Sequence, residues 1–239
     1  MNYWDLALLL VVLCMAVPLA YMRRVSCKAF ILSLPFPGTV AMLSLGKPVN
    51  ASNILGLTLL MLFTHIVRFL YYKRITKNVP AIIIAAVCYG LMGSLLNRIY
   101  PMTTLGFFIA LVWNIVVAVC LLKFMKPRRE PGQKSHLPVP LKILSIILIV
   151  STLIVLKKIL SGFMVVFPMV SMIAMYESRY ALWTICRQMA VIMITFGVFF
   201  TTIFLLQNVI GFYAALACGW AVFISILIPL HRRNFPKKA

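Results

Sequence analysis

Acidic side chains are almost missing from this sequence of 239 residues, which has only Asp5, Glu130 and Glu177. Enzymes that work by proton transfer usually need a paired acid and base, and cation pumps need acidic ligands. Histidine is equally scarce, and the motifs G-x-S-x-G, H-E-x-x-H and the P-loop are all absent. We therefore expect that the protein is not an enzyme.

Metal-type cysteine spacing is also missing. No two of the six cysteines lie within three residues of each other, so the sequence has no C-x-x-C pair and no zinc motif. Five of them lie inside apolar runs, where a thiol behaves as a small hydrophobic group. We expect no metal ion and no cofactor.

What the sequence has in excess is apolar and basic residues. It is 64% hydrophobic, and a soluble chain of this length could not cover so much apolar surface. The formal net charge of +20 would suggest nucleic acid in a soluble protein, but here most Lys and Arg residues flank apolar runs. The composition predicts an all-α polytopic protein of the lipid bilayer that does not bind nucleic acid.

A helix needs about 20 apolar residues to cross the hydrocarbon core, and on that rule the sequence predicts nine spans. The second and seventh of them are short and contain prolines, so each either crosses fully or re-enters. The predicted bounds are 4–22, 29–46, 52–72, 80–99, 105–124, 139–157, 161–178, 182–206 and 208–230.

The distribution of Lys and Arg predicts the orientation. If the N-terminus lies outside, the cytoplasmic loops hold most basic residues, from Lys28 in the first loop to Lys238 in the tail. This agrees with the positive-inside rule and places the C-terminus in the cytoplasm. The polar, proline-rich segment Lys126–Pro140 is predicted to be a solvated linker between two comparable halves.

An internal repeat connects these halves at an offset of 133 residues. FILSLPFPGTVAM, from Phe30 to Met42, aligns with FMVVFPMVSMIAM, from Phe163 to Met175. The repeat predicts four helices in residues 1–100, a linking helix and basic loop in 101–138, and four helices in 139–239. Because one extra span separates the copies, the second four-helix repeat would have inverted topology, as in many transporters.

The second half resembles the GlpM-type family of small bacterial inner-membrane proteins. The resemblance covers about Lys157 to Leu230 and rests on a motif near FP-x-x-x-x-I-A, represented by Phe167, Pro168, Ile173 and Ala174. It covers Arg23 to Leu96 only faintly. The resemblance implies a bacterial inner membrane and a link to glycerol or envelope-polysaccharide metabolism.

The prolines in the aligned stretches predict two broken helices. Pro35, Pro37 and Gly38 interrupt the second span, and Phe167, Pro168 and Ser171 lie at the matching break. Non-helical backbone in a bilayer persists only where protein buries it or a wet cavity solvates it. Two interpretations remain: half-helices that bind a ligand near the midplane, or proline kinks satisfied by neighbouring side chains.

Ionisable residues within spans extend the candidate binding site, because such groups are costly in a membrane. Snorkelling is the alternative for Arg68, and an interfacial pair with Arg179 is the alternative for Glu177. The candidates are mostly cationic and favour an anionic ligand. They are His65, Arg68, Glu177 and Arg187.

The sequence thus supports two functions. The first is a transporter or flippase-like protein with a midplane site for an anionic small molecule or a lipid head group. The second is a non-transporting scaffold or assembly subunit of an envelope or polysaccharide pathway. A transporter predicts a polar cavity lined by both proline motifs, and a scaffold predicts none. The sequence carries no signal for the oligomeric state.

Overall fold

The computed structural model describes residues 3–22, 24–128, 130 and 138–234, and every regular element in these residues is a helix. The all-α prediction is therefore confirmed for the described part of the chain. In chain order the elements are α1 (Tyr3–Tyr21), α2 (Val25–Leu32), α3 (Phe36–Leu45), α4 (Ala51–Tyr72), α5 (Asn78–Ile99), α6 (Thr104–Phe124), α7 (Val139–Leu160), the 3₁₀ helix η1 (Ser161–Val166), α8 (Met169–Glu177), α9 (Leu182–Leu206) and α10 (Phe212–Asn234).

Six stretches of the described chain are long and apolar enough to cross a membrane, so this is a helical membrane protein. They are the combined α2 and α3 (Ser26–Leu45), α4, α5, α6, α9 and α10 (to Arg233). The predicted spans 4–22, 139–157 and 161–178 correspond to shorter apolar stretches: Tyr3–Leu19, Ile143–Thr152 and Ser161–Glu177. The full count of nine spans stays a prediction.

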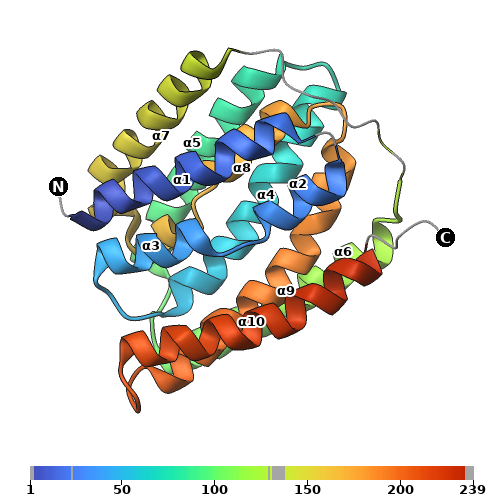
Figure 1. Ribbon diagram of the computed structural model, residues 1–239. Helices are drawn as coiled ribbons and strands as arrows, with labels where there is room; N and C mark the ends of the chain where they lie inside the picture. Colours follow the sequence, from blue (N-terminus) through green and yellow to red (C-terminus); the bar gives the residue numbers. More distant parts are fainter. Residues whose placement is uncertain (1–2, 23, 129, 131–137, 235–239) are drawn as a thin grey trace.

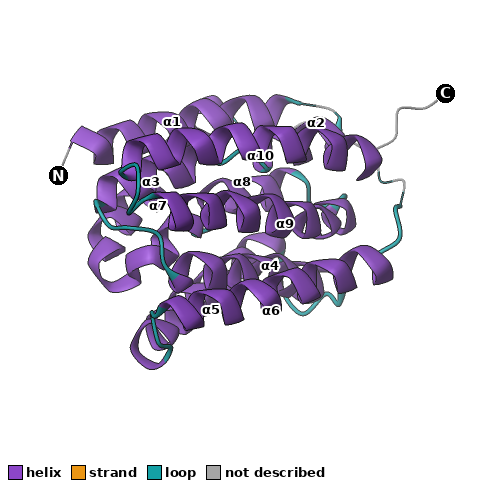
Figure 2. Ribbon diagram, turned by 90° about the horizontal axis from the view of Figure 1, so that it is seen from below, coloured by secondary structure: helices purple, strands orange, loops and turns teal. Residues whose placement is uncertain are grey.

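The long helices α4 and α9 form the centre of the bundle and pack against each other. Figure 2 shows α4, α5 and α6 along one edge, α1 and α2 along the opposite edge, and α8 and α9 between them. The outer helices expose large apolar side chains, such as Leu91 on α5, Val112 on α6 and Leu148 on α7. Apolar residues on the outside are expected where lipid, and not water, surrounds the helices.

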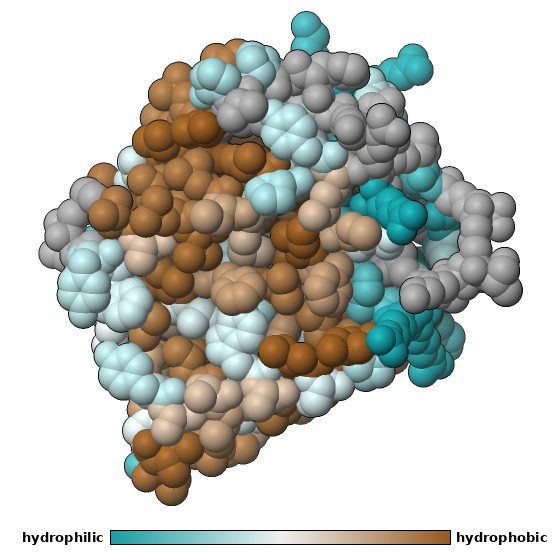
Figure 3. All heavy atoms as spheres, in the orientation of Figure 1, coloured by the Kyte–Doolittle hydropathy of each residue, from teal (hydrophilic) through white to brown (hydrophobic). Residues whose placement is uncertain are grey.

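The chain enters and leaves the bundle at opposite ends (Figure 1). Figure 3 shows apolar residues over most of this face, with hydrophilic residues gathered at the edge where α10 ends. A band of apolar surface with a polar edge is the pattern of a membrane-embedded bundle. Most of the predicted linker, residues 129 and 131–137, and the predicted basic tail beyond residue 234 lie outside the described residues.

Side-chain caps define where several helices begin and end. Asn50 and Asn53 form a capping box at the start of α4, which fixes the turn after α3. Thr103 accepts a hydrogen bond from the backbone N–H of Gly106 at the start of α6. Gly46 caps the end of α3 with a φ of 61°, the left-handed conformation that glycine adopts without strain.

Candidate functional site

The predicted break in the second span lies between α2 and α3. α2 ends at Leu32, and α3 begins at Phe36 after Ser33, Leu34 and Pro35. Proline supplies no backbone N–H, so Pro35 and Pro37 remove two donors that a continuous helix would use. Pro35 is buried. The break is therefore partly covered by protein, although Phe36, the next residue, is 45% exposed.

The predicted break in the seventh span has a different shape. The chain runs through the 3₁₀ helix η1, then Phe167 and Pro168, and begins α8 at Met169. Pro168 is buried, as Pro35 is. Runs of 3₁₀ helix longer than three or four residues are uncommon and often mark a hinge, so the six residues of η1 are a second unusual feature.

The two breaks, far apart in the sequence, meet in the structure. A Cβ atom added to Gly38 would lie 3.0 Å from the carbonyl oxygen of Val165, so the backbones of α3 and η1 approach each other closely at this glycine. A cavity of about 50 Å³ lies beside this contact. Both breaks line it, through Leu34, Pro37 and Gly38 from the first and Val166, Phe167 and Ser171 from the second. We call it the break cavity.

Neighbouring helices supply hydrogen-bond donors to the backbone around the second break. The Tyr89 hydroxyl on α5 donates to the carbonyl of Phe163 at 2.9 Å, and the Asn53 amide on α4 donates to Gly162 at 3.3 Å. At the first break, Gln188 on α9 donates to the Ser33 hydroxyl at 2.6 Å. Sequence reasoning missed these three residues. Their only signal was a polar side chain within an apolar run.

A buried charged group lies near the breaks and corrects the sequence analysis. Lys28 was expected in a cytoplasmic loop, but α2 begins at Val25, and its lysine is only 1% exposed. Its Nζ donates to the backbone carbonyl of Glu177 at 3.3 Å, at the end of α8. Glu177 is itself 5% exposed. Arg179, the interfacial partner considered for it, instead lies over the rings of Tyr176 and Tyr180.

The remaining predicted site residues do not line the break cavity. The His65 ring nitrogen Nδ1 lies 2.9 Å from the Met61 carbonyl of its own helix. Arg187 donates through Nε to the carbonyl of Met125, the residue that caps the C-terminus of α6. Neither residue borders the break cavity, so the expectation that both bind a ligand together with the prolines stays a prediction.

Arg68 belongs to a second cluster, centred on Trp183. The guanidinium carbons of Arg68 and Arg128 lie 4.7 Å and 3.8 Å from the centroid of this indole. Glu130 accepts hydrogen bonds from the backbone N–H groups of Trp183 and Thr184, at 3.3 Å and 2.7 Å, and so caps α9. The cluster attaches the loop after α6 to the beginning of α9, which is a structural role.

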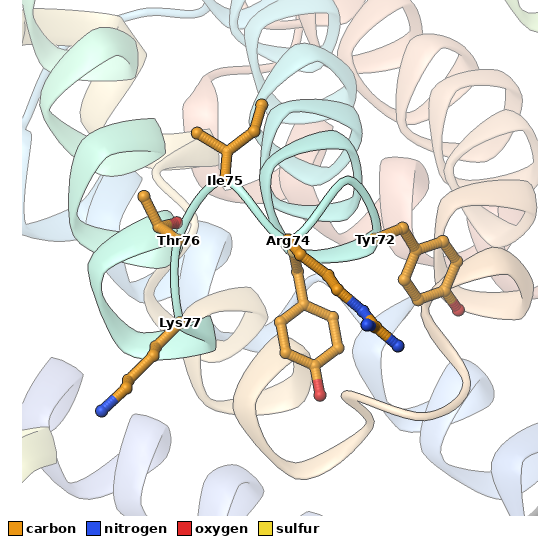
Figure 4. Close-up of a pocket in the computed structure, with 6 residues that line it drawn as sticks. Tyr72, Arg74, Ile75, Thr76 and Lys77 are labelled. Atoms are coloured by element: carbon orange, nitrogen blue, oxygen red, sulfur yellow. The ribbon is translucent and has the colours of Figure 1, made fainter.

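A wide hollow lies beside this cluster, at the turn between α4 and α5. It has a volume of about 610 Å³ and is lined by Tyr71, Tyr72, Arg74, Ile75, Thr76 and Lys77. Figure 4 shows Arg74 and Tyr72 directed to one side and Lys77 to the other. The basic groups diverge, so the hollow lacks the convergent donors that bind an anion tightly.

An apolar groove runs between α5 and α7 on the outside of the bundle. It consists of two hollows of about 560 and 490 Å³, which share the lining residues Ile83, Leu148, Ile149 and Met172. Phe167 lines both the larger hollow and the break cavity. One aromatic ring therefore borders the lateral groove and the break cavity, and we call the two hollows together the lateral groove.

No known protein family matches the chain, and neither a curated protein nor a solved structure does. The resemblance to the GlpM-type family stays a prediction that rests on the residues quoted for it.

Proposed function

We propose that the protein is a multi-pass transporter of the flippase type, whose site lies where the two broken helices meet. Its two units, residues 1–100 and 139–239, would form inverted repeats around the span in 101–138. Packing supports this proposal, because α1 contacts α7 and α4 contacts α9. These are the pairs of equivalent helices that an axis between the units would bring together.

The observation that carries the proposal is that the first turns of two helices border one cavity. Pro37 and Gly38 belong to the first turn of α3, and Val170 and Ser171 to the first turn of α8. A helix N-terminus carries a partial positive charge and free N–H groups, so both helices favour an anion at this point. A small anion or a lipid head group is the ligand class that this geometry supports.

The volume of the break cavity requires movement during transport. About 50 Å³ holds one or two water molecules, since a water occupies about 30 Å³ in the liquid. A phosphate group needs more room, so the half-helices must part around it. The 3₁₀ segment η1 and the short helices α3 and α8 are the elements that could move while α4 and α9 stay packed.

The orientation and compartment belong to the same proposal. An outside N-terminus, a cytoplasmic C-terminus and a bacterial inner membrane are supported by the distribution of basic residues and by the family resemblance. The exit of the chain at the end opposite its entry agrees with an odd number of crossings.

Reconstitution tests this function directly. The purified chain is placed in vesicles that contain fluorescent phosphatidylglycerol, and the fraction accessible to a membrane-impermeant quencher is followed over time. We expect faster exchange than in protein-free vesicles, and at least about tenfold less with Pro35→Ala combined with Pro37→Ala, since alanine restores helix at the break. Pro229→Ala is the matched control, because Pro229 lies inside α10 and away from the cavity.

The scaffold is the second candidate, and the hydrogen bonds at the breaks favour it. Tyr89 and Asn53 already donate to carbonyls of η1, as they would around a rigid kink. If wild-type vesicles exchange lipid no faster than empty ones, and if the proline variants match the wild type, the transporter proposal fails and the scaffold is favoured.

A further inference from the structure

The lateral groove is long compared with one leaflet of a bilayer. Its lining on α5 extends from Val79 to Ser94, and this separation corresponds to about 22 Å along a helix that rises 1.5 Å per residue. The hydrocarbon core is about 30 Å thick, so one leaflet supplies about half of that. The groove can therefore accommodate a hydrocarbon chain beyond the midplane of the membrane.

The lining is suited to hydrocarbon and offers few hydrogen bonds. Two of its hydroxyl groups, on Ser145 and Thr152, donate to carbonyls of their own helix, at Leu141 and Leu148. Gly90 lies on the groove, and a Cβ added there would meet no atom within 4 Å. This open, apolar surface faces the outside of a membrane-embedded bundle, where acyl chains are the surrounding molecules.

Two basic residues lie next to lining residues of one end of the groove, although neither lines the groove itself. Lys77 precedes α5 by one residue, two positions before the lining residue Val79. The guanidinium of Arg179 lies 5.5 Å from the ring centroid of Tyr176, which lines the same end. A hydrogen bond with Tyr180 raises the pKa of Arg179 further, so its charge is permanent.

The acid at this end does not cancel that charge. Glu177 lines the groove, but the buried Lys28 donates to its backbone carbonyl and places a cation beside it. Lys28, Lys77 and Arg179 thus outnumber Glu177, the acid of this end. A phosphate group at the mouth of the groove is the head group that such a charge balance favours.

We propose that the lateral groove binds one acyl chain of an anionic phospholipid, with its phosphate between Lys77 and Arg179. The inference deepens the proposed function and rests on it for where the lipid moves. The ring of Phe167 lies between the acyl chain in the groove and the break cavity. The substrate class is then an anionic phospholipid. The head group of the lipid would pass the broken helices while the acyl chain stays in the groove.

Native mass spectrometry of the full chain in detergent tests the binding. Phosphatidylglycerol and phosphatidylcholine of equal chain length are the probes. Gly90→Leu adds bulk in the groove at a position where a Cβ would meet no atom within 4 Å, and Ala217→Leu adds similar bulk on the exposed face of α10. We expect the wild type and Ala217→Leu to retain phosphatidylglycerol, and Gly90→Leu to retain about tenfold less of either lipid.

A charge variant tests the head group separately. Lys77→Gln combined with Arg179→Gln should weaken phosphatidylglycerol binding by about fivefold for each charge removed and leave phosphatidylcholine unchanged. Equal retention by the wild type and Gly90→Leu would overturn the groove as the site. An unchanged preference in the charge variant, or a stable dimer that Gly90→Leu dissociates, would overturn the anionic lipid as its occupant.

These outcomes are separate from those of the transport assay. Lipid binding without accelerated exchange would refute the transporter and leave the groove as a lipid site. Accelerated lipid exchange without binding of an acyl chain in the groove would refute this inference and leave the transporter proposal in place.

Discussion

The two broken helices differ in how their backbone is satisfied. At the first break, local hydroxyl groups donate to the backbone carbonyls: Ser33 to Ala29 and Thr39 to Pro35, each at 2.8 Å. Gln188 on α9 and Trp220 on α10 donate in turn to these two hydroxyl groups, and not to the backbone. At the second, side chains from two other helices, Tyr89 and Asn53, donate to η1. The backbone carbonyls of the interruption therefore accept hydrogen bonds from local side chains in one copy and from side chains of other helices in the other.

The second break therefore depends more on contacts with other helices. Ser33 and Thr39 can make their bonds in an isolated segment, because residues four apart on a helix are neighbours. A 3₁₀ segment has poorer hydrogen-bond geometry, and its carbonyls here need α4 and α5 to be in place. We expect the loss of a side-chain hydrogen bond to a backbone carbonyl to be more destabilising at the second break than at the first.

The largest effect should come from forcing the two breaks apart. In Gly38→Ala the new methyl would press on the Val165 carbonyl, because a Cβ there lies 3.0 Å from that oxygen. We expect a loss of about 2 kcal/mol in the free energy of unfolding, measured by thermal unfolding in detergent. Gly90→Ala is the matched control and should be neutral or stabilising by up to about 1 kcal/mol. Equal stability of both variants would show that the breaks do not press on each other.

A smaller effect is expected at the second break alone. Tyr89→Phe removes the hydroxyl that donates to the Phe163 carbonyl and leaves the ring contact with Phe167 in place. The expected cost is about 1 kcal/mol by the same measurement. Tyr213→Phe on the exposed face of α10 is the control and should change nothing. If Tyr89→Phe is silent, η1 does not depend on α5.

The smallest effect is expected at the first break. Ser33→Ala removes a hydroxyl that donates to the Ala29 carbonyl and accepts from Gln188, but the Ala29 carbonyl still accepts the backbone N–H of residue 33 at 3.2 Å. We expect a loss of about 0.5 kcal/mol, less than for Tyr89→Phe. A larger loss than at Tyr89 would reverse the comparison and make the first break the more dependent one.

The sequence predicted both breaks because proline acts locally: Pro35 and Pro168 each lack the backbone N–H that a continuous helix would use. Proline does not always stop a helix, since Pro229 lies inside α10. The sequence did not predict whether each break packs against other helices or faces lipid, because that depends on contacts between residues more than a hundred positions apart. Lys28 was misplaced for the same reason. A lysine near a helix end is usually solvated, and only the packing of α8 against α2 shows that this one is buried.

The cationic candidates illustrate another limit of sequence reasoning. Arg68 and Arg187 were predicted to be intramembrane charges, and in the structure Arg68 lies over an indole ring and Arg187 donates to a backbone carbonyl. Neither partner carries a charge pattern that a sequence reveals. The lateral groove was also invisible in the sequence, because its existence depends on the space between α5 and α7 and not on the type of residue that lines it.

The attachment of Glu130 to α9 has a consequence for biosynthesis. The loop that carries Glu130 leaves the ribosome before α7, η1, α8 and α9 exist, yet its carboxylate binds the first N–H groups of α9. During insertion, the basic loop must therefore stay undocked until the later helices are in place. Glu130→Gln, which weakens this contact, should lengthen the interval in which a protease added to nascent chains can cut the loop.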